Sequence, residues 1–255
     1  DSAIANGARV VFCEEMPRHV EAVTIVLVDN ARRAMAMAST EFYGNPTRGM
    51  QTVGVTGTNG KTSVASFLAQ ALSTRVPTAV LGTVGNGFPD HLEPSTHTTL
   101  DAVNLHATLG ALFARGARAV AMEVSSHALH QERVAGVPFH TAVFTNLSHE
   151  HLDYHGDMAN YGRAKRRLFE SKGLKYAVIN IDDDYGRQLL TSMPASVGTV
   201  SYGFDNKNYS PSLLGSNLQL GRNGLRMHVE SDWGSADLSV PLLGGFNASN
   251  ILNIN

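Results

Sequence analysis

A glycine-rich stretch that joins an apolar run to a helical pattern carries the clearest chemistry in this sequence. The apolar run 53–56 leads into residues 57–63, which read GTNGKTS. Glycines let the backbone curl until its N–H groups face phosphate oxygens, and the helix that follows adds its positive N-terminal end. Lys61 can then neutralise the β- and γ-phosphates, and the Thr62 hydroxyl can ligate Mg²⁺. The stretch predicts a nucleotide-binding loop formed by Gly57, Thr58, Asn59, Gly60, Lys61, Thr62 and Ser63.

The spacing of this loop departs from the common pattern G-x-x-x-x-G-K-[ST]. The position five before Gly60 is Val55, and the first glycine of the turn is Gly57. An apolar strand before the turn and a helix after it favour phosphate binding over an ordinary tight turn. A phosphate loop alone does not distinguish a kinase, a GTPase and a ligase, so the reaction must be assigned from other residues.

Acidic and histidine side chains follow two further strand candidates. Glu123 lies near the end of the run 119–124, and a dense polar segment from His149 to His155 follows the run 142–145. Ligands collect at the carboxyl ends of parallel strands, and a carboxylate there suits Mg²⁺. The spacing of His149, His151 and His155 is also compatible with Zn²⁺, and any one of these histidines could be a loop or capping residue. We favour Mg²⁺ because a phosphate loop requires a hard cation.

Lys165 lies in a basic helical pattern whose apolar positions form one face. Tyr161, Ala164, Leu168 and Phe169 define that inward face, and Lys165 comes four residues after Tyr161. The spacing brings Lys165 toward the core side. By itself, however, it predicts a surface lysine whose ammonium reaches water.

Strand-like runs alternate with helical patterns along most of the chain, which predicts βαβ units and a mostly parallel sheet with helices on both faces. The predicted strands are 9–12, 24–28, 52–56, 78–81, 119–124, 142–145 and 176–181, and the predicted helices are 31–43, 62–73, 101–115, 158–170 and 184–193. After residue 196, the runs 218–220, 225–229 and 236–240 predict an antiparallel extension of the sheet. The segment 43–49 is rich in glycine, asparagine and proline, which interrupt helices and strands, and it predicts a domain boundary.

Composition excludes several functional classes. The chain has 255 residues, 43% of them hydrophobic, a formal charge of −2 and a pI of about 6.6. A chain without basic excess is a poor partner for nucleic acid or an anionic membrane. One cysteine, Cys13, excludes an internal disulfide framework, and no apolar run is long enough to span a bilayer. We therefore expect a cytoplasmic protein without membrane insertion, and nothing in the sequence indicates its oligomeric state.

Four separated motifs, in order, closely resemble one family. After the loop 56–62 come MEVSSHAL at 122–129, FTNLS at 144–148, HLDYHGDM at 151–158 and Tyr161-x-x-Ala164-Lys165. These resemble the MurE family of UDP-N-acetylmuramoyl-tripeptide synthetases among the Mur ligases. The resemblance is strong over 52–169 and returns at Gly245-Phe246-Asn247-x-x-Asn250.

The resemblance implies roles for individual residues, with ATP and Mg²⁺ as cofactors. Lys61, Glu123, His151 and a carbamylated Lys165 would be catalytic, and Thr62, Glu123, His151 and Lys165 would serve the magnesium sites. Asn247 and Asn250 would contact the adenine side of the nucleotide. The muramoyl-peptide would contact His97, Thr98, Thr99, Ser125, Gln131 and Arg133. The sequence departs from the family pattern at His97, where we expect Asn, and at 149–150, where His-Glu replaces the expected Arg-Asp.

The implied reaction is ATP-dependent amide formation through an acyl phosphate. The carboxylate would belong to UDP-MurNAc-L-Ala-D-Glu, and the amine to a diamino acid, with meso-diaminopimelate favoured over L-lysine. The alternatives are a sister ligase, MurF or folylpolyglutamate synthase, and a non-catalytic nucleotide-binding or zinc module. The runs 125–127 and 153–156 argue against a sister ligase, and the joint presence of Lys61, Thr62, Glu123, His151 and Lys165 argues against a non-catalytic module.

The resemblance also implies a domain organisation. Residues 1–48 would be the last part of an N-terminal UDP-binding domain, 49–247 the central ATP-binding domain, and 248–255 the start of a connection to a C-terminal ligase domain. The chain looks cut at both ends. On this interpretation, we expect these 255 residues alone to bind ATP poorly and to turn over little.

Overall fold

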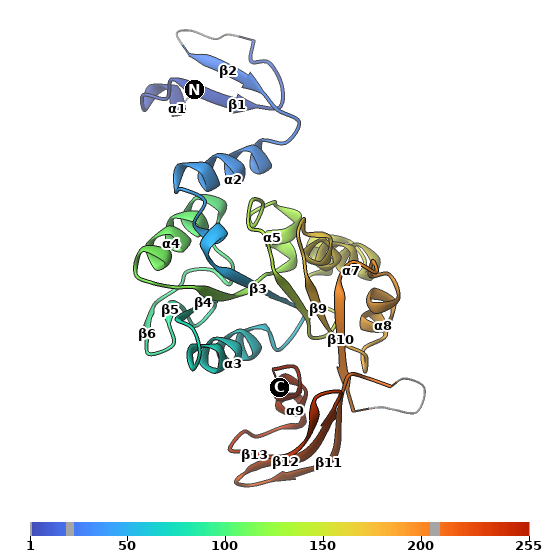
Figure 1. Cartoon of the computed structure of the whole chain (residues 1–255). Coiled ribbons are helices and arrows are strands. Elements are labelled where there is room, and N and C mark those ends of the chain that lie inside the picture. The colour runs from blue at the N-terminus through green and yellow to red at the C-terminus, as the bar shows by residue number, and fades with distance from the viewer. Residues whose placement is uncertain (1, 19–22, 205–209, 255) are drawn as a thin grey trace.

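The computed structural model describes residues 2–18, 23–204 and 210–254, and it divides into a small N-terminal part and a large α/β body (Figure 1). The N-terminal part contains helix α1 (Ser2–Ala5) and two parallel strands, β1 (Val10–Cys13) and β2 (Thr24–Leu27). Helix α2 (Ala31–Phe42) and the 3₁₀ turn η1 (Pro46–Gly49) lead from this pair into the body. Asn30 caps α2, because its side chain accepts the backbone N–H of Arg33.

The body is built on one sheet of eleven strands in the order β13-β12-β11-β10-β9-β8-β3-β7-β4-β5-β6. The strands are β3 (Gln51–Thr56), β4 (Thr78–Gly82), β5 (Gly85–Phe88), β6 (His91–Glu93), β7 (Ala119–Glu123), β8 (Thr141–Phe144), β9 (Tyr176–Asn180), β10 (Gly198–Gly203), β11 (Leu213–Gly221), β12 (Gly224–Ser231) and β13 (Gly234–Val240). In the sheet, the neighbouring strands β11, β10, β9, β8, β3, β7 and β4 pair in parallel. Strands β5 and β6 extend one edge of the sheet antiparallel, and β12 and β13 extend the other edge antiparallel. Strand β3 lies between β7 and β8. The chain therefore leaves β3 to one side and later returns to the other, which places a ligand-binding crevice at its carboxyl end.

Helices cover both faces of the central strands. Helix α3 (Lys61–Ser73) covers one face, where Val64, Ala65 and Ala69 pack on strand residues such as Val55 and Val143. The opposite face is covered by α4 (Ala102–Ala114), α5 (Ser126–His130), the 3₁₀ turn η2 (Arg167–Glu170) and α8 (Asp184–Thr191). Two further helices, α6 (Leu152–His155) and α7 (Met158–Arg166), connect β8 to η2.

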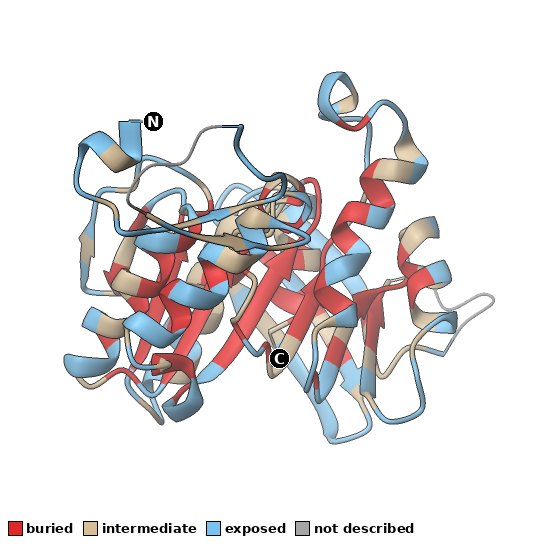
Figure 2. Cartoon of the chain, turned by 90° about the horizontal axis from the view of Figure 1, so that it is seen from above, coloured by how far each residue is buried: buried red, intermediate tan, exposed pale blue. Residues whose placement is uncertain are grey.

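The alternation of side chains along β7 and β8 explains why these strands are apolar throughout. Val120 and Met122 face the α4 side, whereas Ala121 faces α3. In the same way Phe144 faces the α4 side and Val143 faces α3. Both faces of a parallel sheet are covered, so both sets of positions must be buried. Figure 2 shows this as a buried band through the central strands.

The antiparallel extension has its own small core. Helix α9 (Gly245–Leu252) packs Ala248, Ile251 and Leu252 against Tyr202 of β10 and against Leu225 and other apolar residues of β11 and β12. Helix α9 also returns toward α3, which carries the predicted phosphate loop at its start. Helix α9 therefore lies near the carboxyl ends of the central strands, which the polar residues follow.

The predicted fold class is confirmed, as are the predicted strands and helices, apart from shifts of their ends; the predicted helix 158–170, for example, forms as α7 and η2. The predicted antiparallel extension is present as β11–β13. Strands β5, β6 and β10 and helices α1, α5, α6 and α9 were not predicted. The β5–β6 hairpin is rich in glycine because a Cβ atom at Gly85 or Gly87 would collide with the backbone of β6, and such a segment has no apolar periodicity.

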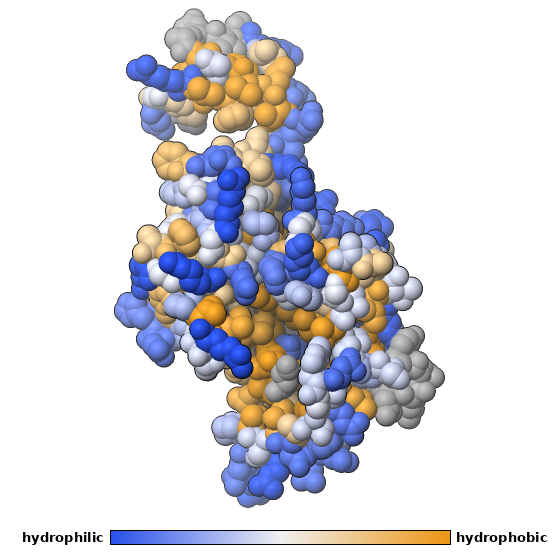
Figure 3. Space-filling view, viewed as in Figure 1, coloured by the Kyte–Doolittle hydropathy of each residue, from blue (hydrophilic) through white to orange (hydrophobic). Residues whose placement is uncertain are grey.

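Apolar side chains gather on the exposed surface of the N-terminal strand pair, where Val10, Phe12 and Leu27 are all exposed (Figure 3).

Across the described residues, no helix has the length and apolar character that crossing a membrane requires.

Candidate functional site

The predicted phosphate loop forms at the carboxyl end of β3, the central strand. Strand β3 ends at Thr56, α3 begins at Lys61, and Gly60 caps the helix with a φ of 88°. Only glycine takes this left-handed conformation without strain. A Cβ atom at Gly57, with a φ of 148°, would collide with the Oγ1 atom of Thr145. The two glycines therefore make a tight turn whose next element is a helix N-terminus, as anion binding requires.

The two residues that directly follow β8 form hydrogen bonds to the phosphate loop. The N–H of Asn59 donates to Oδ1 of Asn146 at 3.0 Å, and the Asn146 side chain donates back to the Asn59 carbonyl at 3.0 Å. The Thr145 hydroxyl donates to the same carbonyl at 2.6 Å. Sequence reasoning assigned no role to Asn146, although its place directly after a strand was a usable signal. These bonds preorganise the loop before any ligand binds.

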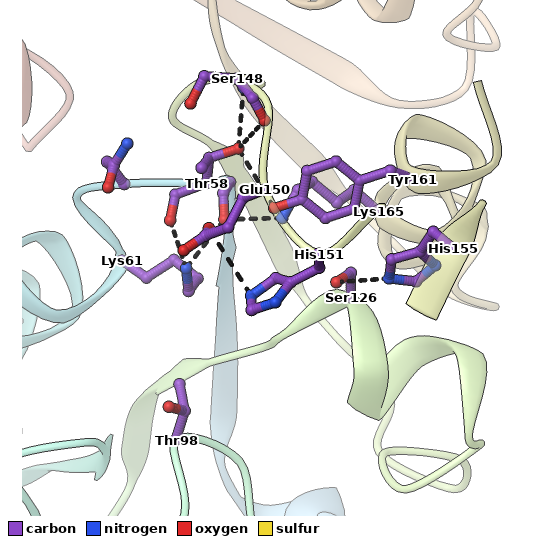
Figure 4. A network of polar contacts seen from close by, with 12 residues as sticks. Thr58, Lys61, Thr98, Ser126, Ser148, Glu150, His151, His155, Tyr161 and Lys165 are labelled. Carbon is purple, nitrogen blue, oxygen red and sulfur yellow. Dashed lines mark hydrogen bonds and ion pairs between the residues drawn. The ribbon is translucent and has the colours of Figure 1, made fainter. Parts of the chain in front are cut away.

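Two lysine ammonium groups meet at one carbonyl of this loop (Figure 4). Lys61 donates to the carbonyls of Gly57 at 2.9 Å and Thr58 at 2.7 Å, and Lys165 donates to the same Gly57 carbonyl at 2.7 Å. Burial lowers the pKa of Lys61, and the charges of Glu123 and Glu150 oppose that shift. The two lysine nitrogens therefore meet at the carbonyl of Gly57, the first residue of the loop.

Lys165 is not the surface lysine that helical spacing alone predicts. It is 1% exposed, and its Nζ atom lies 4.3 Å from the centre of the Tyr161 ring. Burial, reinforced by the charge of Lys61, lowers the pKa of Lys165 to about 6. The helical spacing gave a wrong prediction because α7 packs the face that carries Tyr161 against the loop. Lys165 lies four residues later on the same face and is therefore buried with Tyr161. A buried lysine of this kind is largely a neutral amine at pH 7.5.

Glu123, the last residue of β7, and Thr62, in the first turn of α3, are brought together. The Thr62 hydroxyl donates to Oε2 of Glu123 at 2.8 Å, and the carboxylate is 2% exposed. Thr83, which directly follows β4, adds its N–H at 2.7 Å to Oε1 and its hydroxyl at 3.3 Å to Oε2. Sequence reasoning missed Thr83, although its position directly after a parallel strand was again the available signal. The carboxylate is thus fixed toward the loop.

The predicted substrate residues Thr99, Ser125, Gln131 and Arg133 form one connected group beside Glu123. The Thr99 hydroxyl donates to the Glu123 carbonyl at 2.8 Å and accepts the Ser125 N–H at 3.1 Å. Arg133 donates to the Thr99 carbonyl at 3.0 Å and to Oε1 of Gln131 at 2.9 and 2.6 Å. The Ser125 side chain also caps α5 by accepting the N–H of Ala128.

The remaining predicted contacts differ in how closely they approach this group. The Thr98 and Thr83 hydroxyl oxygens lie 3.1 Å apart, which places Thr98 at the Glu123 end. His97 is exposed and contacts the neighbouring Thr96 side chain at 2.9 Å.

The end of the chain approaches the phosphate loop through Asn250 of α9. Asn250 is buried and lies against the loop, since a Cβ atom at Gly60 would come within 2.5 Å of its Oδ1 atom. Asn247 contacts Asn250 at 3.3 Å and the Leu243 carbonyl at 2.8 Å, and Ser63 lies half-buried in the first turn of α3.

The histidine segment forms a cluster of rings that pack edge-on or at a tilt against one another. His151 caps α6 in a left-handed conformation, lies 3.7 Å from the Glu150 carboxylate, and packs edge-on against His127 at 4.8 Å between ring centres. His155 contacts the Ser126 hydroxyl at 3.0 Å, and burial together with the neighbouring His127 and His130 lowers its pKa to about 4. Within 2–18, 23–204 and 210–254, no three His, Cys, Asp or Glu side chains are arranged to hold a metal ion, so this geometry does not favour the zinc site.

Comparison with known proteins shows the family of the chain. Residues 55–253 match the model of the Mur ligase middle domain. The chain is 47% identical over 234 residues, 91% of its length, to a UDP-N-acetylmuramoyl-L-alanyl-D-glutamate--2,6-diaminopimelate ligase from Alkalilimnicola ehrlichii, and covers 47% of that protein. It is 42% identical over 259 residues to the protein of the same name from Coxiella burnetii, covering 99% of this chain and 53% of that protein. The chain thus spans about half the length of the curated relatives it matches.

Solved structures agree with this result. A structure of a UDP-N-acetylmuramoyl-L-alanyl-D-glutamate--2,6-diaminopimelate ligase superposes with a TM-score of 0.89 at 34% identity, covering 99% of this chain and 52% of that one. MurF from Thermotoga maritima shares the fold, with a TM-score of 0.65 at 19% identity over 100% of this chain and 54% of the other. The phosphate loop, the Glu123 strand end and the buried lysine all lie within the matched residues, and the chain belongs to the Mur ligase family, whose middle domain it contains.

Proposed function

We propose that this chain is the nucleotide-binding part of a longer ATP-dependent, ADP-forming amide ligase that acts in the cytoplasm. The proposed reaction joins meso-diaminopimelate to UDP-MurNAc-L-Ala-D-Glu; the names of the relatives at 42% and 47% identity give 2,6-diaminopimelate as the amine and UDP-N-acetylmuramoyl-L-alanyl-D-glutamate as its partner. The observation that carries the proposal is the convergence of Lys61, Thr62, Glu123 and Lys165 at one edge of the sheet. A sister ligase of the MurF or folylpolyglutamate synthase type is less favoured, because those solved structures are only 17–19% and 15–18% identical to this chain.

The loop and Lys61 supply the site for the ATP phosphates. Backbone N–H groups at the start of α3 and the positive end of that helix favour an anion there. Lys61 donates to its own loop carbonyls, so its ammonium is already held where it can transfer those hydrogen bonds to a phosphate. We assign Asn247 and Asn250 to the adenine side on the resemblance, supported by the approach of Asn250 to Gly60.

The donors beside the loop fit Mg²⁺. The Thr62 hydroxyl and the Glu123 carboxylate are hard oxygen donors, 2.8 Å apart and preoriented by Thr83. His151 and Lys165 complete the proposed set, and Lys165 would do so as an anion. Bound Mg²⁺ would neutralise the charge of the transferred phosphoryl group.

Carbamylation of Lys165 is chemically consistent with its surroundings. The reaction requires a neutral amine whose nitrogen attacks the carbon of CO₂, forms an N–C bond and releases a proton to solvent. The lowered pKa of Lys165 provides that neutral amine, and the ammonium of Lys61 at the same carbonyl would stabilise the resulting anion. This modification replaces a neutral amine beside Lys61 with an anion that attracts the Lys61 ammonium.

The remaining residues position the muramoyl-peptide carboxylate. A carboxylate oxygen attacks the γ-phosphorus and ADP leaves; the amine nitrogen then attacks the acyl carbon, phosphate leaves, and the nitrogen loses a proton. Thr98, Thr99, Ser125, Gln131 and Arg133 lie beside Glu123 and would orient this carboxylate, while His97 would contact the more exposed part of the substrate. Positioning and charge neutralisation account for most of the catalysis in such reactions.

The domain boundaries belong to the same proposal. We assign residues 1–48 to an N-terminal UDP-binding domain, 49–247 to the ATP-binding domain and 248–255 to a connection with a further domain. The segment 43–49 supports the first boundary: Asn45 has a left-handed conformation with a φ of 56°, and a 3₁₀ turn follows it. Because the amine contacts, and the adenine contacts beyond those of Asn247 and Asn250, would come from the further domain, the 255 residues alone should turn over little.

The test is ATP consumption by the full-length ligase that carries this chain. The enzyme is supplied with UDP-MurNAc-L-Ala-D-Glu and either meso-diaminopimelate or L-lysine, beside a Lys165→Ala variant. Turnover with meso-diaminopimelate, lost in the variant, supports the proposal. Turnover with L-lysine alone corrects the amine, and turnover with neither indicates a sister ligase or a non-catalytic module.

A further inference from the structure

Tyr154 of α6 connects the histidine cluster to the proposed substrate residues. Its hydroxyl lies 3.0 Å from Nε2 of Gln131 and 2.9 Å from Nδ1 of His130. Gln131 is the C-cap of α5, so these contacts bridge α6 to the end of α5. The mechanism above assigns no role to this tyrosine.

The chemistry of the partners determines which way the Gln131 amide points. Arg133 has only donors and places two N–H groups, at 2.9 and 2.6 Å, on one atom of Gln131, so that atom must be the carbonyl oxygen. The NH₂ group then faces Tyr154, whose hydroxyl accepts its hydrogen bond. The tyrosine proton remains available for a hydrogen bond to His130, whose Nδ1 atom lies 2.9 Å away. Each group in this series therefore has a partner of the opposite kind.

These hydrogen bonds continue to Glu123, at the carboxyl end of strand β7. Arg133 also donates to the Thr99 carbonyl at 3.0 Å, and Thr99 bridges the Glu123 carbonyl and the Ser125 N–H. A rotated Gln131 amide would present its NH₂ group to the guanidinium, and both would be donors. Arg133 would then lose two bonds that hold it beside Thr99.

We propose that Tyr154 is a positioning residue whose hydroxyl sets the orientation of the Gln131 amide and thereby the place of the Arg133 guanidinium. This role rests on the proposed function, because Gln131 and Arg133 are assigned to the muramoyl-peptide. Tyr154 acts on substrate binding through Gln131 and takes no part in nucleotide binding.

Substitution Tyr154→Phe separates the hydroxyl from the ring. The ring of Tyr154 lies 4.2 Å from the His127 ring, and phenylalanine keeps that packing. Tyr176→Phe is the matched control, because Tyr176 is 50% exposed and its ring contacts that of His140. Thermal unfolding of both variants should match that of the unsubstituted ligase.

The kinetic arm uses the full-length ligase and a double-substitution cycle. Tyr154→Phe should raise KM for UDP-MurNAc-L-Ala-D-Glu by about 3- to 10-fold, the usual value of one hydrogen bond, with kcat and KM for ATP within about 2-fold. In a Gln131→Ala background the same substitution should add less than about 2-fold. An unchanged KM in Tyr154→Phe, or the full effect without Gln131, overturns the proposal.

A structural arm is independent of the substrate. Crystal structures of the full-length ligase and its Tyr154→Phe variant should show the Arg133 guanidinium leaving Oε1 of Gln131 in the variant. If both side chains stay in place, the positioning role is wrong whatever the enzyme acts on. If the side chains move but the unsubstituted ligase does not turn over the muramoyl-dipeptide, the positioning role stands and the proposed substrate fails.

Discussion

The two sides of the candidate site hold their residues in different ways. Around the Gly57 carbonyl, two lysines approach each other inside the protein, and burial lowers the pKa of both. On the α5–α6 side, the rings of His127, His151 and Tyr154 pack against one another, and the Tyr154 hydroxyl forms hydrogen bonds with His130 and Gln131.

The difference separates charge stabilisation from orientation. Like charges held together in a poorly solvated place destabilise the empty protein, and they become favourable when an anion such as a phosphate or a carbamate arrives. Stacked rings and paired amides cost little and hold their geometry without any ligand. We therefore expect substitutions on the loop side to change catalysis strongly, and those on the ring side to act moderately or through pH.

The largest effect should come from Lys61→Ala in the full-length ligase. Loss of the ammonium at the phosphates should reduce kcat/KM by about 10³-fold, near 4 kcal/mol of transition-state stabilisation. Steady-state ATP consumption measures this, with the exposed Lys175→Ala as control. A variant that keeps more than a tenth of the activity would show that Lys61 does not contact the transferred phosphate.

A smaller loss is expected for Thr62→Val, which keeps the shape of the side chain and removes its hydroxyl. Glu123 would lose the 2.8 Å bond from Thr62, and we expect a loss of about 10²-fold together with a higher Mg²⁺ requirement. Thr62→Ser keeps the hydroxyl and should stay close to the unsubstituted enzyme. Equal losses for Val and Ser would assign the effect to packing of the first turn of α3.

Lys165→Met should stabilise the protein while removing its activity. The folded pKa of Lys165 is lowered to about 6 from 10.5, so between these values the unfolded chain binds more protons and stability rises with pH. The cost of the buried amine at pH 7.5 is of the order of 4 kcal/mol, which methionine avoids. Urea unfolding in bicarbonate-free buffer between pH 6 and 9 should show a slope that the variant lacks. A variant less stable than the parent contradicts this account.

The smallest effect belongs to the ring side and appears only in acid. The folded pKa of His155 is lowered to about 4 from 6.5, so His155 contributes stability above pH 6.5 that is lost as pH falls toward 4. The loss should be about 1–2 kcal/mol, and His155→Gln should reduce it. Unfolding midpoints at pH 7 and 4.5 measure this, beside the exposed His97→Gln. Identical acid slopes for the two variants would exclude His155 as the responsible group.

Features that depend on a few neighbouring residues could be predicted from the sequence. The loop 57–63 needs only neighbouring residues: two glycines for the turn, a lysine and a threonine for the phosphates, and a helix start. Glu123 was found in the same way, because it ends an apolar run that can only be a buried strand. The parallel sheet followed from the alternation of such runs with helical patterns.

Features that depend on distant contacts required the structure. Thr62 and Glu123 are 61 residues apart, and Lys165 and Gly57 are 108 apart, so no local period reveals that they meet. The spacing of α7 left Lys165 at the surface, whereas the packing of Tyr161 against the loop draws it inward. For Thr83 and Tyr154, only the partners found in the structure give the residue a role.

The sequence by itself therefore determined the type of chemistry, because phosphate binding is encoded in adjacent residues whose backbone conformation is local. The tertiary structure alone decided the charge state and the orientation of the side chains. A lysine becomes a neutral amine only when burial removes its water, and an amide takes one orientation only when an arginine and a tyrosine lie on opposite sides of it. Both conditions arise from contacts between elements that the chain order separates.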